Sequence, residues 1–232
     1  MNFLRFAEFD GDGRGCLHGF TLRSNPPMGT ADIPQILQEA GLPENYVMGE
    51  QTHGAGVAVV GLRESGRVIP GVDGLVTMEK NLSLVIRVAD CGPIWIRCKK
   101  TGAIGLVHSG RKGTEAGVVQ VAIRKMRDEY GAEVRDMVAL LGPCVRPPHY
   151  EVNFAAEIIR QLEREGVGQI VDSGLCTAQD MKRFYSYRAE KGKTGRHFAL
   201  LARGDSFSTF FRWGGGGRSV SSLDEGGKRE PA

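Results

Sequence analysis

Short runs of apolar residues, separated by polar and glycine-containing segments, divide the middle of the chain into predicted strands. Three runs follow one another closely, at residues 82–88, 93–98 and 103–107. The segment Lys99-Lys100-Thr101-Gly102 between the second and third runs is typical of a hairpin turn. Further apolar runs at 57–60 and 137–141 predict two more buried strands.

Apolar residues at helical spacing predict the helices. The first begins after Asp32 as N-cap and ends at Gly41, the second has Thr114 as N-cap and ends at Gly131, and the third spans 154–165 after Asn153. A capping-box pattern predicts one more helix at Thr177. The segment from 103 to 141 reads as strand, helix and strand, which indicates a right-handed parallel crossover. Together with the hairpin it predicts an α/β fold, with a mixed sheet flanked by helices.

The periodic pattern ends near residue 203. A chain of 232 residues with 41% apolar composition can bury one full core. Gly214 to Gly217 and the polar residues after them predict a flexible tail, although Phe207, Phe210, Phe211 and Trp213 could dock on the body. We therefore expect a single α/β domain over residues 1–203 and a flexible Gly/Ser-rich tail over 204–232.

Charge and composition narrow the class of protein. The chain has 30 basic and 27 acidic residues, and this net charge of +3 is too small and too evenly spread to indicate nucleic-acid binding. No apolar run approaches the roughly 20 residues of a membrane span, and the N-terminus lacks the order of a signal peptide. Five widely spaced cysteines without a Cys-x-x-Cys pair do not indicate a disulfide framework. We expect a cytoplasmic protein with reduced thiols and no nucleic-acid or membrane partner.

Reactive side chains follow two of the predicted strands. Cys91 and His108 each stand beside a glycine-containing turn at a strand's carboxyl end, where α/β sheets bind ligands. If those two strands are parallel neighbours, the two side chains share one edge of the sheet. His53, in the loop before strand 57–60, is the best third partner by position. One thiolate with two imidazoles suits Zn²⁺ or copper, with a fourth position open.

Other interpretations of these residues stay open at this point. Cys91 could be a small buried hydrophobe and the histidines satisfied core or surface residues. A metal-free hydrolase, with Cys91 as nucleophile and His108 as base, is a functional alternative. A multicopper oxidase is excluded, because five histidines without a His-x-His pair cannot hold its copper cluster.

A series of motifs occurs in order between residues 17 and 202: Gln51-Thr52-His53-Gly54, Asp73-Gly74-Leu75-Val76-Thr77, Ala89-Asp90-Cys91-Gly92-Pro93, His108-Ser109-Gly110, Gly142-Pro143-Cys144-Val145, Tyr150-Glu151-Val152, Cys176-Thr177, Phe184-Tyr185-Ser186-Tyr187-Arg188 and Thr194-Gly195-Arg196. This series resembles the laccase-domain family, also called multicopper polyphenol oxidases and described as purine nucleoside phosphorylases. A bacterial branch of this family is linked to editing of peptidoglycan precursors.

The resemblance implies a three-layer α/β/α sandwich and one metal ion, usually Zn²⁺ with copper as the alternative, at His53, Cys91 and His108. It implies phosphorolysis of adenosine, inosine, guanosine and methylthioadenosine, and adenosine deamination in some members. Copper-dependent phenol oxidation and a catalytically idle metal-binding scaffold are the alternatives.

Further residue roles are expected at the same site. Cys91, His108 and Asp90 would be catalytic, with Asp90 orienting a ligand histidine or transferring a proton. Arg188 and Arg196 would bind phosphate, and Gln51 and Lys112 would also contact substrate.

Two departures from the family put its substrate preference in question. His108-Ser109-Gly110-Arg111-Lys112-Gly113 stands where the family reads His-Ala-Gly-Trp-Arg-Gly, so an aromatic is lost and a lysine without a bidentate fork replaces an arginine. The segment from Arg23 to Gln51 is also shorter than the family's. We expect an altered substrate preference or a reduced activity.

Overall fold

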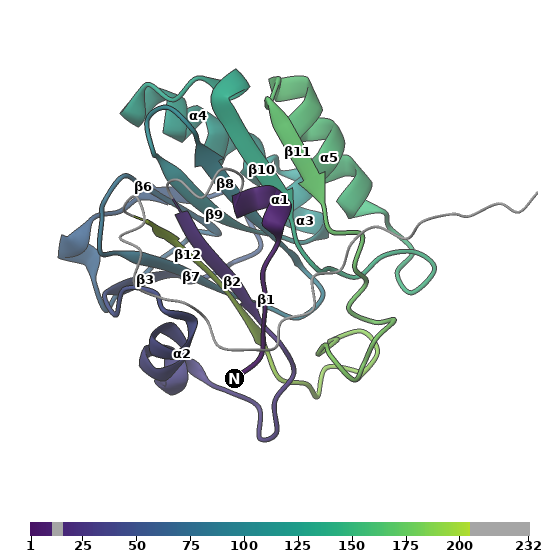
Figure 1. Cartoon of the computed structure of the whole chain (residues 1–232). Coiled ribbons are helices and arrows are strands. Elements are labelled where there is room, and N and C mark those ends of the chain that lie inside the picture. The colour runs from purple at the N-terminus through teal and green to yellow at the C-terminus, as the bar shows by residue number, and fades with distance from the viewer. Residues whose placement is uncertain (11–15, 205–232) are drawn as a thin grey trace, which may run out of the picture.

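The strands of the computed structural model, which describes residues 1–10 and 16–204, form two six-stranded sheets (Figure 1). The first sheet has the order β1 (Phe3–Leu4), β2 (Cys16–Thr21), β12 (His197–Arg203), β7 (Ser83–Val88), β3 (Tyr46–Gly49) and β5 (Val68–Ile69). The second has the order β11 (Gln169–Asp172), β10 (Met137–Leu141), β8 (Gly92–Cys98), β9 (Ile104–Ser109), β6 (Gly74–Thr77) and β4 (Val57–Val59).

Five α-helices occur in the described part of the chain: α1 (Ala7–Asp10), α2 (Ile33–Ala40), α3 (Arg111–Glu115), α4 (Val118–Tyr130) and α5 (Phe154–Glu165). Single 3₁₀ turns lie at Thr30–Asp32, Leu62–Glu64 and Val134–Asp136. None of the helices within residues 1–10 and 16–204 is long and apolar enough to cross a membrane.

The two sheets pack face to face, with helices on their outer faces. A central apolar cluster contains Leu84 and Ile86 of the first sheet together with Trp95 and Leu106 of the second. The indole of Trp95 donates to the Leu200 carbonyl at 2.9 Å and so links the sheets directly. Helices α4 and α5 cover the outer face of the second sheet, and α2 covers that of the first.

The expected mixed α/β class is confirmed, but the strands form two sheets rather than the one mixed sheet we expected. Both sheets contain parallel and antiparallel pairs. The reason lies between β7 and β8, where three residues with Asp90 at φ 84° carry the chain from the first sheet into the second. Because β7 and β8 each pack between two apolar layers, their sequences read as continuous apolar runs.

The predicted hairpin and crossover are present in the second sheet. β8 and β9 pair antiparallel on either side of a turn at Gly102, whose φ is 75°. β9 and β10 both run antiparallel to β8 and are therefore parallel to each other, with β8 between them.

Two predicted helices have the expected boundaries, a third ends at Gly131 as expected but starts elsewhere, and the fourth is absent. Helix α2 follows Asp32 and ends at Gly41, and α5 begins after Asn153, whose side chain accepts from the Ala156 amide. Thr114 is not an N-cap: it lies inside α3, where its hydroxyl donates to the Gly110 carbonyl at 2.8 Å. The helix predicted at Thr177 is absent, because that hydroxyl donates to Asp90 instead of capping its own backbone.

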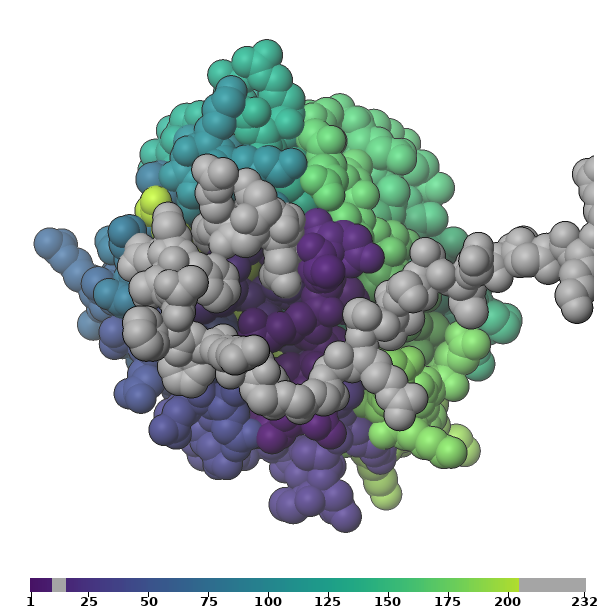
Figure 2. Space-filling view, viewed as in Figure 1, coloured from purple at the N-terminus to yellow at the C-terminus, as the bar shows by residue number. Residues whose placement is uncertain are grey.

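Helix α1 contacts β10 of the second sheet, whereas β1 pairs with β2 in the first; Figure 2 shows this purple N-terminal segment beside the green C-terminal part of the chain. Gln169 on β11 donates a hydrogen bond to the Glu8 carbonyl of α1 at 3.3 Å. The tail predicted over 204–232, including Phe207 to Trp213, falls outside the described residues from 205 on. The division of the chain at residue 203 stays a prediction.

Candidate metal centre

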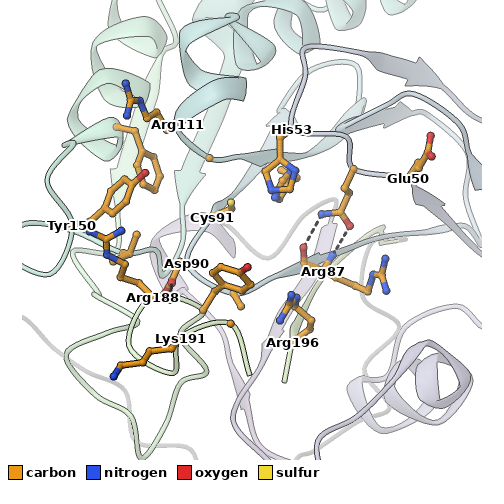
Figure 3. Close-up of a pocket in the computed structure, with 18 residues that line it drawn as sticks. Glu50, His53, Arg87, Asp90, Cys91, Arg111, Tyr150, Arg188, Lys191 and Arg196 are labelled. Atoms are coloured by element: carbon orange, nitrogen blue, oxygen red, sulfur yellow. Dashed lines mark hydrogen bonds between the residues drawn. The ribbon is translucent and has the colours of Figure 1, made fainter. Parts of the chain in front are cut away.

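His53, Cys91 and His108 lie together where the chain passes between the two sheets. His53 is in the loop that leads from β3 to β4, Cys91 is in the turn from β7 to β8, and His108 is near the end of β9. Their ligand atoms all lie within 4.8 Å of one another. Figure 3 shows the His53 imidazole and the Cys91 thiol at one pocket. We expected Cys91 and His108 to share one edge of a sheet if their strands were parallel neighbours. That condition is wrong, because β7 and β9 belong to different sheets.

Asp73 is a buried carboxylate that organises this group. Its Oδ1 atom lies 2.8 Å from His108 Nδ1 and accepts a hydrogen bond from the His53 amide at 2.9 Å. Its Oδ2 atom accepts from the Gly54 amide at 2.9 Å and from the Thr52 hydroxyl at 3.2 Å. Because Nδ1 of His108 is hydrogen-bonded to Asp73, Nε2 is the ring nitrogen that is available on the pocket side. Many histidine ligands of metals are oriented by a carboxylate in this way.

The loop that carries His53 has an unusual backbone. Gln51 and His53 have φ values of 66° and 62°, a region that costs about 1–2 kcal/mol for each non-glycine residue. The three hydrogen bonds from residues 52 to 54 to Asp73 offset that cost. The position of His53 therefore depends on a carboxylate 20 residues further along the chain.

The electrostatics of the metal-free group favour an ion pair. Burial raises the pKa of Cys91, but hydrogen bonds to His108 and His53 outweigh it and bring the pKa to about 7. Burial lowers the pKa of His108, and the hydrogen bonds to Asp73 and Cys91 reverse this and raise it to about 9. Burial likewise opposes the ionisation of Asp73, yet the hydrogen bond from His108 leaves its pKa below the ordinary value.

The local packing and donor set fit a bound metal ion. A Cβ atom at Gly110 would lie 2.6 Å from the Cys91 sulfur, so any residue other than glycine would clash with that sulfur. Cys91 reaches the thiolate form near neutral pH, and one His108 nitrogen faces the group. The exposed His53 side chain can adjust its position toward an ion. Sulfur with two imidazoles is a donor set that Zn²⁺ accepts.

The group opens into a cavity of about 910 Å³. The lining includes five cationic side chains and three aromatic ones, with Glu50 and Asp90 as the acidic residues: Arg87, Arg111, Arg188, Lys191 and Arg196, with Tyr150, Phe154 and Tyr187. A cavity of this size holds a ligand as large as a nucleoside. The cations favour an anionic ligand or co-substrate.

Asp90 joins the Cys91 turn to the far wall of the pocket. Its Oδ1 atom accepts from the Thr177 hydroxyl and its Oδ2 atom from the Arg188 amide, each at 2.6 Å. Both carboxylate oxygens are therefore occupied by the protein. The catalytic role that we expected for Asp90 stays a prediction.

The four predicted substrate-binding residues have different surroundings. Gln51 lines the pocket, but its amide binds both the carbonyl and the amide of Arg87, at 2.6 and 2.8 Å. Arg188 pairs with Glu151 at 2.8 Å, and Arg196 donates to two carbonyls of its own loop. Lys112 is exposed on α3 and is not among the lining residues, whereas Arg111 is. These roles too remain predictions.

Sequence reasoning passed over Asp73 and Arg87. Asp73 directly precedes an apolar run, and a carboxylate buried with such a strand requires partners. That signal was available in the motif Asp73-Gly74-Leu75. Arg87 offered a weaker signal, as the single charge within the apolar run 82–88.

A family model described as multi-copper polyphenol oxidoreductase laccase matches residues 25–158 and 152–204. Purine nucleoside phosphorylase SCO2081 of Streptomyces coelicolor is 33% identical over 205 residues, which cover 77% of this chain and 84% of the relative. Purine nucleoside phosphorylase Rv2149c of Mycobacterium tuberculosis is 37% identical over 204 residues, covering 76% and 80%.

Among solved structures, YlmD from Geobacillus stearothermophilus superimposes with a TM-score of 0.78 at 24% identity, covering 88% of this chain and 96% of that one. YfiH from Bacillus licheniformis gives a TM-score of 0.74 at 21% identity, covering 81% and 92%. These two structures establish a shared fold, and the match to the family model covers more than half of the chain. The chain belongs to the multi-copper polyphenol oxidoreductase laccase family.

Proposed function

We propose that this protein is a zinc-dependent purine nucleoside phosphorylase, acting on adenosine, inosine, guanosine and methylthioadenosine. The observation that carries the proposal is the His53, Cys91 and His108 group in the wall of a cavity lined by cations and aromatic rings. Relatives at 33% and 37% identity bear the name purine nucleoside phosphorylase.

The donor set supports zinc as the metal. Cys91 and the two histidines would hold the ion, and His108 would do so through the nitrogen that Asp73 leaves open. A bound Zn²⁺ would supply a Lewis acid with an open coordination position. The residues described contain one such group, and the chain has five histidines, which argues against a copper cluster.

The pocket side chains would position the two substrates. A purine ring can stack on the exposed Tyr187 or on Tyr150, and the arginines would hold hydrogen phosphate. A phosphate oxygen forms a bond to the ribose C1′ while the bond from C1′ to the purine nitrogen breaks. The purine leaves with the bonding electrons and takes the proton of hydrogen phosphate, which gives the free base and ribose 1-phosphate.

Within this proposal Asp90 acts as a positioning residue. It holds the turn of Cys91 and the loop of Arg188 in one arrangement through its two oxygens. Deamination of adenosine is a second activity that we propose for the same site, since it also uses a bound purine nucleoside.

The test incubates purified full-length protein of known metal content with each nucleoside, with and without inorganic phosphate. Free base and ribose 1-phosphate report phosphorolysis, and inosine formed from adenosine reports deamination. We expect base release that requires phosphate and that is lost in Cys91→Ser and His108→Gln together with the metal. His149→Gln, an exposed histidine outside the group, is the matched control and should keep both.

Three results would contradict the proposal. Metal retained in both ligand variants would reject the assigned ligands. Oxidation of a phenolic dye that depends on copper and Cys91, without cleavage of any nucleoside, would favour the phenol oxidase. One metal per chain with no turnover of either substrate class would favour the idle scaffold, an alternative that fits the altered loop from His108 to Gly113.

A further inference from the structure

Two of the five cationic side chains in the pocket come from neighbouring parts of the first sheet. β12 pairs antiparallel with β7, with Phe198 opposite Arg87 and His197 opposite Val88. Arg196 directly precedes β12 and stands two positions before Phe198, so its backbone lies near the diagonal position from Arg87, a spacing of about 7–8 Å in a regular antiparallel pair. Figure 3 shows Arg87 and Arg196 on the Glu50 side of Cys91, away from Tyr150 and Arg111.

These two arginines differ in their partners from Arg111 and Arg188, the other two arginines of the pocket. Arg111 pairs with Glu115 at 2.9 Å and Arg188 with Glu151 at 2.8 Å. Within residues 1–10 and 16–204, Arg87 makes no ion pair, and Arg196 binds only neutral carbonyl oxygens, those of Thr194 and Gly195. Their positive charges therefore have no carboxylate partner in the described structure.

The backbone of Arg87 and the side chain of Arg196 are held by their surroundings. The side-chain amide of Gln51 clamps the Arg87 backbone from both sides, which ties it to the loop of His53. The Arg196 guanidinium lies 5.7 Å from the centre of the Tyr187 ring, and its NH1 group is fixed by the two carbonyls. Glu50, the acidic residue at this end, accepts from the Gly71 amide at 2.7 Å and pairs with neither arginine.

We propose that Arg87 and Arg196 form the subsite for inorganic phosphate, and that Gln51 serves this subsite by positioning Arg87. Two guanidinium groups at one end of the pocket, neither paired with a carboxylate among the described residues, match the charge of hydrogen phosphate, which carries close to two negative charges at neutral pH. The inference rests on the proposed function for the identity of the anion. It reassigns the predicted role of Gln51 from contacting substrate to holding Arg87, and it places Arg188 outside the phosphate subsite.

The experiment measures the affinity of the full-length protein for inorganic phosphate by calorimetric titration, with Arg87→Gln and Arg196→Gln. Each variant should weaken phosphate binding about 10- to 100-fold, as expected for the loss of one charge-assisted pair. Lys191→Gln is the matched control, because Lys191 is an exposed cation of the same pocket without an ion pair in the described residues. It should change the affinity less than about twofold. Unchanged thermal unfolding verifies that each variant is folded.

Steady-state kinetics separate this inference from the proposed function. In Arg87→Gln, the KM for phosphate should rise at least tenfold while the KM for nucleoside stays within about twofold. Nucleoside cleavage with an unchanged KM for phosphate in both arginine variants would overturn the subsite and leave the function standing. Phosphate binding that depends on Arg87 and Arg196, without cleavage of any nucleoside, would support the subsite and reject the function. An equal loss of phosphate affinity in Lys191→Gln would also overturn the subsite.

Discussion

Replacing Asp73 by asparagine should both destabilise the protein and weaken its hold on metal. The carboxylate accepts four hydrogen bonds, two at each oxygen. An amide turns one of those oxygens into a donor, so in either orientation one backbone N–H, of His53 or of Gly54, loses its acceptor, and the His108 ring or the Thr52 hydroxyl must change from donor to acceptor. At about 1.5–3 kcal/mol for a bond to a buried charge, the loss of that one bond costs at least about 1.5–3 kcal/mol. That is a large part of the total stability of most domains.

The same substitution acts on the metal through His108. If the amide nitrogen faces His108 Nδ1, that nitrogen must become an acceptor, and the ring proton moves to the nitrogen that should bind the ion. If the amide nitrogen faces Gly54 instead, the loop of His53 loses its anchor and can leave the positive φ region. Either way, we expect zinc affinity to fall about 10- to 100-fold, as when outer-shell partners of metal ligands are removed.

Urea unfolding of the metal-free protein and zinc competition against a chelating dye measure the two effects separately. The control is Asp32→Asn, because Asp32 also accepts a backbone hydrogen bond, from Gly29 at 2.7 Å, but at the exposed start of α2. It should cost less than about 1 kcal/mol. The reasoning fails if Asp73→Asn unfolds within about 1 kcal/mol of the wild type and binds zinc equally well.

Three further predictions concern pH, thiol reactivity and space at the site. Burial lowers the pKa of His197 to about 4. Between pH 6.5 and 4, His197 is therefore protonated in the unfolded chain but neutral in the folded protein. The unfolding free energy should therefore fall by roughly 3 kcal/mol as the pH drops through that range. His197→Gln should remove this dependence on pH. Parallel curves of unfolding free energy against pH for the two proteins would contradict the assignment of the slope to His197. In metal-free protein, iodoacetamide should modify Cys91 at a rate that rises through about pH 7, whereas Cys144, whose pKa burial raises to about 12, should stay unmodified and zinc should protect Cys91. Mass spectrometry of the labelled peptides identifies the sites, and equal labelling of both thiols would be inconsistent with the structure. Gly110→Ala should lower zinc retention after dialysis by at least about tenfold, because its Cβ would lie 2.6 Å from the Cys91 sulfur, while Gly29→Ala, with its nearest atom at 3.9 Å, should retain zinc fully.

The sequence was informative about the fold wherever an element is set by its own residues. Gly41 and Gly131 end their helices with positive φ, and Gly102 closes the hairpin. The division into two sheets could not be predicted in this way. A strand buried between two layers reads as the same apolar run whether its neighbours lie in one sheet or in two. The Asp90 backbone that directs the chain from one sheet to the other is left-handed, and nothing local to the sequence requires that.

For the site, the sequence indicated the three candidate ligands but not the residues that support them. His53, Cys91 and His108 stand out by chemical type, whereas the value of Asp73 comes from donors that only the fold brings to it. Thr177 was predicted to cap a helix from its local sequence, but its hydroxyl donates to Asp90, 87 positions away, instead of capping the local backbone. Long-range hydrogen bonds of this kind decide which of two locally plausible roles a polar side chain takes.

The contacts of Asp90 have a consequence for the order in which the protein is assembled during synthesis. All three candidate ligands and Asp73 are present once residue 108 has been made. The opposite wall of the pocket requires Thr177 and Arg188, which join Asp90 across 87 and 98 positions. Because translation proceeds from the N-terminus at about 5–20 residues per second, the ligand residues leave the ribosome several seconds before the residues that enclose the substrate. A chain shortened before Thr177 therefore contains all three candidate ligands, but it lacks the partners that fix Asp90 beside Cys91 and the strand β12 that pairs with β7, so metal capture and substrate capture both depend on the C-terminal part of the described chain.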